Sequence, residues 1–225
     1  MSDKNLKDQM NEYYRTRAPW HDDYLSYTDN QSMEKLLGPL IQYFEDYITN
    51  QDILEIACGT GNWTQVLAKR ARSVLATDVA DSMIQIARKK PYPEGKIEFK
   101  IADAYTLKEV EGSFNCAFAA DWFSHIPKSS IKPFLKVLHK KLEKGARVVF
   151  IDMMYRDHPD LSGFWEDKEG NLIKRRKLPN GQEFDVVKNY PEKEELFGYL
   201  EGMAEDIEYK EHIGLLRWIL AYRVG

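Results

Sequence analysis

The sequence predicts an α/β fold built on a doubly wound parallel sheet. Between residues 51 and 151, short apolar runs typical of buried strands alternate with segments that have the apolar spacing of amphipathic helices. This pattern favours parallel strands with helices on both faces. Two further strand-like runs, 204–212 and 215–223, meet around Gly214. They predict an antiparallel hairpin added to the parallel sheet.

The alternating region is expected to contain five strands and three helices. Asp81 is expected to be the N-cap of the second helix, and Gly145 suits the C-terminal end of the third. Apolar runs mark strands at 53–57, 73–77, 96–102, 114–120 and 147–151, and helical spacing marks 62–70, 82–90 and 130–142.

Helices are also expected before this region. Residues 31–48 form a strong amphipathic stripe, within which Pro39 must start or kink a helix because it donates no backbone hydrogen bond. Residues 3–17 place five side chains on one helical face, namely Leu6, Met10, Tyr13, Tyr14 and Arg17.

The tail contains a second hairpin signal. Asn180 and Gly181 separate two strand-like runs, and this dipeptide is typical of a two-residue loop. Such a loop pairs position 176 with 185 and position 175 with 186. Pro191 is expected to open a short helix, at a position where proline is tolerated.

The composition argues against several classes of function. The chain has 32 Lys and Arg residues against 36 Asp and Glu residues, a net charge of −4, whereas binding to nucleic-acid phosphates needs a basic face. The longest apolar runs are about five residues, and a membrane span needs roughly 20. The first residues lack the apolar core of a signal peptide. The cysteines and histidines show no spacing of a disulfide framework or a metal site. We therefore expect a cytoplasmic protein, monomeric or homodimeric, that uses no nucleic acid, membrane or metal.

The segment Glu55-Ile-Ala-Cys-Gly59-Thr-Gly61 follows the first strand and opens the first helix. Its glycines let the backbone turn sharply and approach a ligand closely. Asp78 ends the next strand, where a carboxylate can accept both hydroxyl groups of a ribose. Thr64 stands where a nicotinamide-binding fingerprint has its third glycine. The Glu55 carboxylate would repel a pyrophosphate but suits a cofactor that carries an ammonium group.

These features resemble the class I S-adenosylmethionine (SAM) methyltransferases, most strongly over residues 50–152. The resemblance rests on Glu-x-x-x-Gly-x-Gly and on the acid that ends the second strand. It implies SAM as cofactor, S-adenosylhomocysteine (SAH) as product and a Rossmann-like seven-stranded sheet ending in an antiparallel hairpin. A single domain is expected, with an N-terminal helical lid (1–48), a SAM-binding core (49–152), an acceptor-side insertion containing a β-hairpin (153–190), and a C-terminal helix and strand hairpin (191–225).

A narrower resemblance covers nearly the whole chain. The segments 13–18, 59–63, 121–127 and 175–181 are similar to a bacterial group of small-molecule O-methyltransferases that includes the dehydrophos phosphonate O-methyltransferase. His21 departs from this group, which usually has Tyr there. Asp185 also departs from it, since a basic residue is expected at that position.

The resemblance assigns cofactor-binding roles along the chain. Asp103 and Ala104 match the segment that contacts adenine, and Asp121 and Trp122 match the floor of the methyl pocket. The N-terminal helix is implied to cover the methionine carboxylate. Core packing is an equal alternative for Trp63 and Met83. The expected cofactor-binding residues are Tyr14, Arg17, Glu55, Ala57, Gly59, Gly61, Trp63, Asp78, Val79, Met83, Asp103, Ala104, Asp121 and Trp122.

The acceptor side is predicted from the hairpin. A two-residue loop places Arg175 on the apolar face with Val186, where a guanidinium needs an anionic partner or a route to water. Arg176 then faces Asp185 as a surface ion pair. We therefore expect Arg175 to anchor the acceptor, and the resemblance adds Tyr27 as its partner.

His125 is the candidate general base, because the reference imidazole pKa of about 6.5 suits proton transfer near pH 7. A phosphonate or carboxylate acceptor is already ionised and needs no base, so O-methylation of an anionic metabolite is expected. Two alternatives stay open at this point. One is N- or O-methylation of a neutral aromatic or amine, and the other is SAM binding without catalysis.

Overall fold

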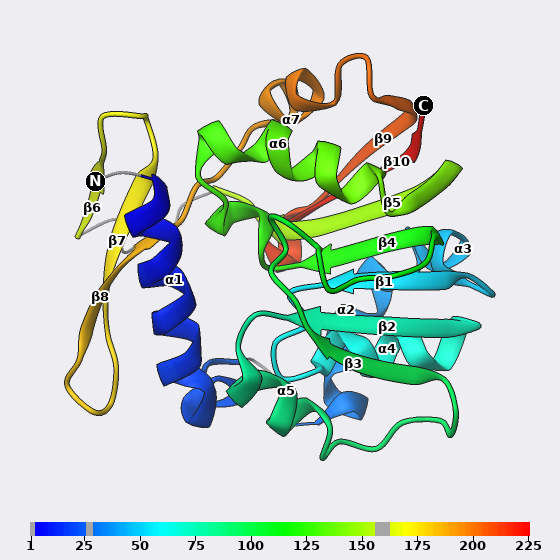
Figure 1. Cartoon of the computed structure of the whole chain (residues 1–225), viewed down its shortest axis with the longest axis horizontal. Helices are drawn as coiled ribbons and strands as arrows, with labels where there is room; N and C mark the ends of the chain where they lie inside the picture. The colour runs from blue at the N-terminus through cyan, green and yellow to red at the C-terminus, as the bar shows by residue number, and fades with distance from the viewer. Residues whose placement is uncertain (1–2, 26–28, 156–162) are drawn as a thin grey trace.

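The computed structural model describes residues 3–25, 29–155 and 163–225 of the chain. Its centre is a seven-stranded sheet in the order β3-β2-β1-β4-β5-β10-β9 (Figure 1). The first five strands in this order are parallel, and β10 runs antiparallel to both β5 and β9. The predicted fold class is thus confirmed, including the antiparallel ending. The strands are β1 (Asp52–Ile56), β2 (Ser73–Asp78), β3 (Ile97–Ile101), β4 (Phe114–Ala120), β5 (Leu142–Met153), β9 (Ala204–His212) and β10 (Arg217–Val224).

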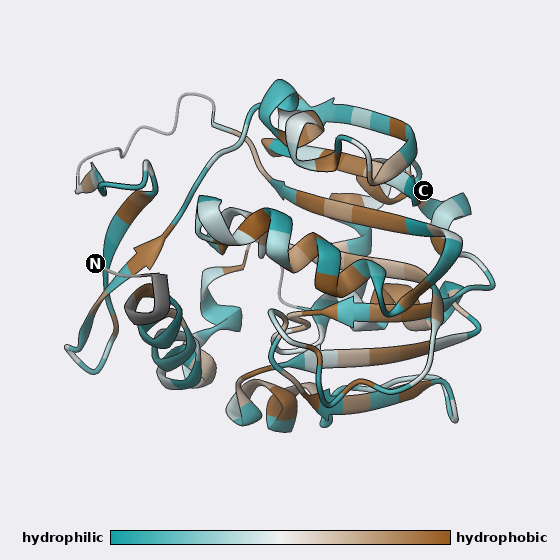
Figure 2. Ribbon diagram, turned by 45° about the horizontal axis from the view of Figure 1, so that its top comes forward, coloured by the Kyte–Doolittle hydropathy of each residue, from teal (hydrophilic) through white to brown (hydrophobic). Residues whose placement is uncertain are grey.

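Helices cover both faces of this sheet and enclose two apolar cores. On one face, α6 and α7 pack over Phe150 and Trp218. On the other face, α2 to α5 pack over Ile53 and Phe118. Figure 2 shows the hydrophobic residues concentrated on the central strands. The helices are α2 (Asn30–Ile41), α3 (Glu45–Ile48), α4 (Asn62–Arg70), α5 (Asp81–Ala87), α6 (Lys128–His139) and α7 (Lys193–Leu200). None of the helices in the described ranges has the length and apolar character needed to cross a membrane.

A second, three-stranded antiparallel sheet stands beside the large one. It contains β6 (Phe164–Glu166), β7 (Leu172–Lys177) and β8 (Glu183–Val187) in that order. Helix α1 (Asp3–Arg17) lies between the two sheets (Figure 1). Its buried face, with Leu6 and Met10, packs on Ile173 of β7 and Val186 of β8. The apolar face predicted for this helix therefore covers the small sheet.

Several local predictions are wrong by a few residues. Ala80 is the N-cap of α5, and Asp81 is its first residue and accepts a hydrogen bond from the Gln85 side chain. Helix α6 ends at His139, and Gly145 lies inside β5 with a φ of +74°. The strand therefore begins before the expected position, because the backbone of β5 pairs with β4 as early as Leu142.

Two prolines also differ from expectation. Pro39 lies inside α2, which ends two residues later at Ile41 and leaves the rest of the amphipathic stripe to the short helix α3. Pro191 precedes α7, whose N-cap is Glu192. Proline is tolerated near a helix boundary because its missing N–H is least needed there.

The second hairpin has a different register from the predicted one. Arg175 lies opposite Asp185 and Arg176 lies opposite Phe184. The Leu178 carbonyl accepts from the Gly181 N–H at 2.8 Å, and the Leu178 N–H donates to the Gln182 carbonyl at 2.9 Å. The loop therefore has three residues and places Gly181 at a φ of +87°, a common alternative to the two-residue turn. A shift of one residue exchanges the two faces of a strand.

Candidate active site

A cavity of about 430 Å³ lies where the parallel strands end. Its walls come from the residues that follow β1 to β5, from the inner side of α1, and from β7 and β8. A volume of this size is within the range of roughly 300–1,000 Å³ found for small-molecule sites. The cavity is therefore the candidate active site.

Most of the predicted site residues line this cavity. Gly61 and Arg175 do not line it, and Tyr27 falls outside the described residues. The predicted residues that do line it are Tyr14, Arg17, Glu55, Ala57, Gly59, Trp63, Asp78, Val79, Met83, Asp103, Ala104, Asp121, Trp122 and His125.

The loop between β1 and α4 has the positive backbone angles that its glycines allow. Gly59 has a φ of +56° and lines the cavity. Gly61, with a φ of +80°, is the N-cap of α4. A β-carbon on Gly61 would lie 2.4 Å from the Tyr92 hydroxyl and 3.0 Å from Cβ of Ala87. Gly61 itself does not line the cavity, and its missing β-carbon is needed for packing against the end of α5; its contact with a cofactor stays a prediction.

Two buried carboxylates stand side by side at the base of the cavity. Asp78 accepts the N–H of Gly59 at 2.9 Å with one oxygen and the N–H of Ala80 at 2.8 Å with the other. Glu55 accepts the Thr64 hydroxyl at 2.7 Å. Burial raises the pKa of both acids, that of Glu55 to about 8. A positively charged or hydrogen-bond-donating ligand would therefore stabilise the charged form of each carboxylate.

The side of the cavity near the end of α1 carries unused hydrogen-bond donors. Arg17 donates from Nη1 to the Tyr13 hydroxyl at 3.1 Å, and its guanidinium lies 4.7 Å from the centre of the Tyr24 ring. Arg17 Nε, His21 Nδ1 and Trp63 Nε1 are buried and have no hydrogen-bond partner among the described residues. Trp63 also packs 5.5 Å from Phe118, so it belongs to the core and to the cavity wall.

The opposite side of the cavity is aromatic. Asp103 holds its turn by accepting the Tyr105 N–H at 2.8 Å. The centres of the Tyr105 and Trp122 rings lie 5.9 Å apart. Lys7 Nζ of α1 lies 4.0 Å from the centre of the Tyr105 ring. Asp121 has a φ of +57° and pairs with Arg217 of β10. These rings suit a flat, apolar ligand group.

A buried polar cluster borders the cavity at β8. Lys188 is only 4% exposed, and its ammonium donates to the Ser124 hydroxyl at 2.6 Å and lies 3.4 Å from Asp152. His125 Nδ1 lies 2.6 Å from the Val187 carbonyl, so it carries the proton and leaves Nε2 as an acceptor. Burial lowers the pKa of His125 well below its usual value, with Lys188 acting in the same direction.

The hairpin register decides which arginine reaches the cavity. Arg175 forms two hydrogen bonds with Asp185, at 2.7 and 3.0 Å, and neither residue lines the cavity. Arg176 lines the cavity and has no carboxylate partner among the described residues. The predicted positions of the two arginines are therefore exchanged, because the loop has one residue more than expected.

The sequence patterns did not identify several other cavity residues. Lys188 and Arg217 come from segments far from any motif, and only their isolated charge within an apolar strand marks them. Lys7 lies on the N-terminal helix outside its predicted apolar face, and His21 and Tyr24 follow that helix, where no helical spacing was expected. All five line the cavity.

Comparisons with known proteins agree on the core. A family model described as "Methyltransferase domain" matches residues 53–145, and a model described as "tRNA (Uracil-5-)-methyltransferase" matches residues 8–97. Demethylmenaquinone methyltransferase of Lactococcus lactis subsp. lactis is 32% identical over 119 residues, which are 51% of this chain and 45% of that protein. The 2-methyl-6-phytyl-1,4-hydroquinone methyltransferase of Synechocystis is 24% identical over 161 residues, 70% of this chain and 49% of that protein. The chain thus spans about half the length of these curated relatives.

Two solved structures match over almost the full length. The DhpI–SAM–HEP complex has a TM-score of 0.78 at 26% identity and covers 97% of both chains. The DhpI–SAH complex has a TM-score of 0.77 at 25% identity, with 98% of this chain and 97% of that chain covered. The small second sheet and the N-terminal helix are therefore part of the shared fold.

The cavity fits the cofactor that these comparisons imply. Glu55 and Asp78 can take the ammonium and ribose hydroxyl groups of SAM, and the unused donor of Arg17 can take its carboxylate. The aromatic side, with Trp122, suits an adenine ring. The domain model identifies residues 53–145 as a methyltransferase domain, and in its fold and this set of side chains the chain is similar to the class I SAM-dependent methyltransferases.

Proposed function

We propose that this protein transfers the methyl group of SAM to an oxygen atom of a small anionic acceptor, such as a phosphonate or a carboxylate. The observation that carries the proposal is the charge at the β8 side of the cavity. Arg176, Lys177 and Lys188 all line it. An acceptor with negative charge would be attracted to this side of the cavity.

The burial of Lys188 strengthens the argument. Burial lowers the pKa of Lys188, and Arg176 and Arg17 act in the same direction, whereas Asp152 raises it. The single carboxylate of Asp152 is therefore near several cations, Lys188, Arg176 and Arg17, in a buried site. Buried charges need paired partners, and an anionic acceptor would supply the missing charge.

The mechanism needs alignment more than acid–base chemistry. SAM supplies an activated methyl group on a sulfonium. Arg176 would hold the acceptor through oxygens other than the attacking one, because direct pairing lowers the reactivity of an oxygen. Tyr14 and Trp122 would exclude water, and the walls would hold the acceptor in line with the methyl group. Good alignment supplies roughly 7–11 kcal/mol of barrier reduction, so no base is compulsory.

A neutral aromatic acceptor is the second candidate, and the aromatic lining favours it. Tyr14, Tyr24 and Trp122 border the cavity, and two curated relatives are named as quinone or hydroquinone methyltransferases. A phenol would require a base, and His125 Nε2 is the available acceptor in the cavity. A tRNA substrate is disfavoured by the net charge of −4, since nucleic-acid binding needs a basic face.

Matched pairs of acceptors test the proposal. SAH release is measured with phosphonates and carboxylates, and with their amide or alcohol isosteres of equal size. Turnover of the anions alone supports the proposal. Turnover of neutral phenols or amines at equal or higher kcat/KM overturns it and favours the second candidate.

A further inference from the structure

We propose that Asp22 and Lys90 form a latch that holds the N-terminal segment on the glycine-containing loop, and that Asp22 is a positioning residue for the cofactor. This proposal rests on SAM binding in the cavity. Asp22 belongs to a short 3-10 helix, Asp22–Tyr24, that follows α1. It does not line the cavity itself, so its effect on the cofactor would be exerted through its neighbours.

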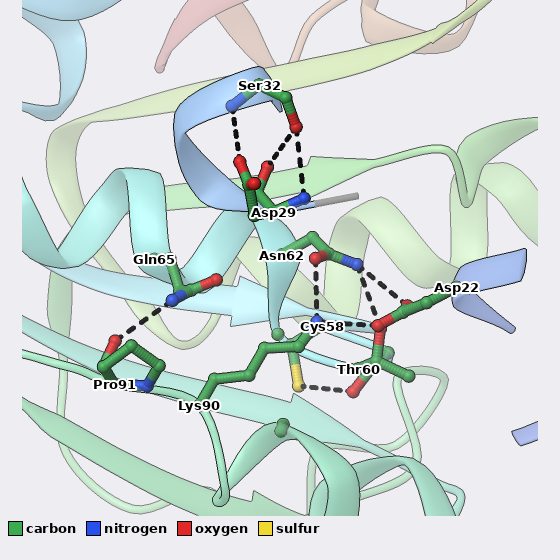
Figure 3. Close-up of polar contacts among 12 residues, drawn as sticks. Asp22, Asp29, Ser32, Cys58, Thr60, Asn62, Gln65, Lys90 and Pro91 are labelled. Carbon is green, nitrogen blue, oxygen red and sulfur yellow. Dashed lines mark hydrogen bonds and ion pairs between the residues drawn. The ribbon is translucent and has the colours of Figure 1, made fainter. Parts of the chain in front are cut away.

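Four polar side chains from three segments are joined at this point (Figure 3). Asp22 Oδ1 accepts the Thr60 hydroxyl at 2.5 Å and the Asn62 amide at 3.1 Å. Lys90 Nζ donates to Asp22 Oδ2 at 3.0 Å and to the Asn62 side-chain carbonyl at 2.7 Å. The Asn62 amide also donates to the Thr60 hydroxyl at 3.0 Å. The N-terminal segment, the loop after β1 and the end of α5 are thus connected by mutually satisfied groups.

Two residues close to Asp22 in the sequence, His21 and Tyr24, give the cluster its importance for the cavity. His21 and Tyr24 both line the cavity. His21 Nε2 lies 3.7 Å from the place where a β-carbon on Gly59 would stand, and the Tyr24 ring faces the Arg17 guanidinium. Release of Asp22 would therefore free the wall of the cofactor site that His21, Tyr24 and Arg17 form.

The partial exposure of the Asp22–Lys90 ion pair indicates that the pair affects the cofactor site more than the stability of the whole protein. The side chains of Lys90 and Asp22 are 19% and 41% exposed, and ion pairs this close to solvent contribute little to global stability. Burial would raise the pKa of Asp22, but the hydrogen bonds from Thr60 and Lys90 hold it below its usual value. The carboxylate is therefore charged at neutral pH. Loss of the latch is expected to alter cofactor retention more than folding.

The experiment measures SAH binding by the full-length protein without any acceptor. Asp22→Asn keeps the size of the side chain but removes the charge that faces Lys90, and Lys90→Met removes the cation. Residues in one polar network are energetically coupled, so we expect each variant to raise the SAH Kd roughly tenfold, mainly through faster dissociation. The double variant should be no weaker than either single variant, and Asp22→Glu should recover part of the affinity.

A second ion pair provides the matched control. Asp52 at the start of β1 pairs with Arg72, at 2.8 Å between Nε and Oδ1; neither residue lines the cavity. Asp52→Asn should leave the SAH Kd unchanged. The latch is contradicted if Asp22→Asn and Lys90→Met retain the Kd and dissociation rate of the wild type, or if they act only by lowering the melting temperature of the free protein. Failure of the wild type to bind SAH would instead overturn the proposed function.

Discussion

The Thr64 hydroxyl donates a 2.7 Å hydrogen bond to Glu55 at the buried base of the cavity. Burial raises the pKa of Glu55 to about 8, the nearby Asp78 acts in the same direction, and the bond from Thr64 opposes them. Glu55 therefore holds a proton in the free protein at pH 6.5. An ammonium group placed beside it favours the charged form, so cofactor binding and proton release are linked.

We therefore expect SAH to bind more tightly as the pH rises from about 5.5 to 7.5, a window below the usual α-amino pKa of about 7.7–8.0. Affinity rises with pH because the pKa of Glu55 is raised in the free protein and is lowered when the ammonium group of the ligand lies beside it. Titration calorimetry at pH 6.5 in two buffers of different ionisation enthalpy should detect release of close to one proton. Glu55→Gln should abolish the release. If this variant still releases the same amount, another group is its source.

Asp78 is expected to dominate cofactor affinity. Its oxygens are fixed by the N–H groups of Gly59 and Ala80, which aims the remaining acceptor positions into the cavity. A hydrogen bond to a charged group is worth about 1.5–3 kcal/mol, so Asp78→Ala should weaken SAH binding at least tenfold. Asp81→Ala, which changes an acid just outside the cavity, is the control. A near-normal Kd for Asp78→Ala would argue against contact between this residue and the cofactor.

Substitution of the two adjacent arginines of β7 distinguishes an effect on acceptor binding from an effect on cofactor binding. Arg176 lines the cavity, while Arg175 is bound to Asp185 outside it. Arg176→Ala should raise the KM of an anionic acceptor by about tenfold or more, since one charge-assisted hydrogen bond is lost. The KM of SAM should change little. Arg175→Ala serves as the control and should change neither KM by more than twofold. The reverse result would contradict the register of the hairpin.

The sequence is informative where local pattern and topology agree. Glu55 and Asp78 could be placed together in one cavity because the carboxyl ends of parallel strands meet at one edge of a sheet. The choice between Arg175 and Arg176 depends on one residue of loop length, and Asn180-Gly181 is compatible with both loops. Lys188 enters the site only through packing of β8 against α1 and the Ser124 segment. Contacts between distant segments leave no periodic signal.

His125 separates the two candidate acceptor classes. Its Nδ1 donates to the Val187 carbonyl, and its pKa lies well below the usual value because of burial and the nearby cations. The imidazole is thus neutral above pH 6.5, so kcat for a carboxylate acceptor, which stays fully ionised over this range, should be flat from pH 6.5 to 9 at saturating SAM. His125→Asn should then lower kcat less than tenfold, since an ionised oxygen has no proton to lose. With a phenolic acceptor the same change should cost about 10²–10⁴-fold, the usual contribution of a general base. A large loss with anionic acceptors would mean that His125 orients the acceptor through Nε2, and KM should then rise together with the fall in kcat.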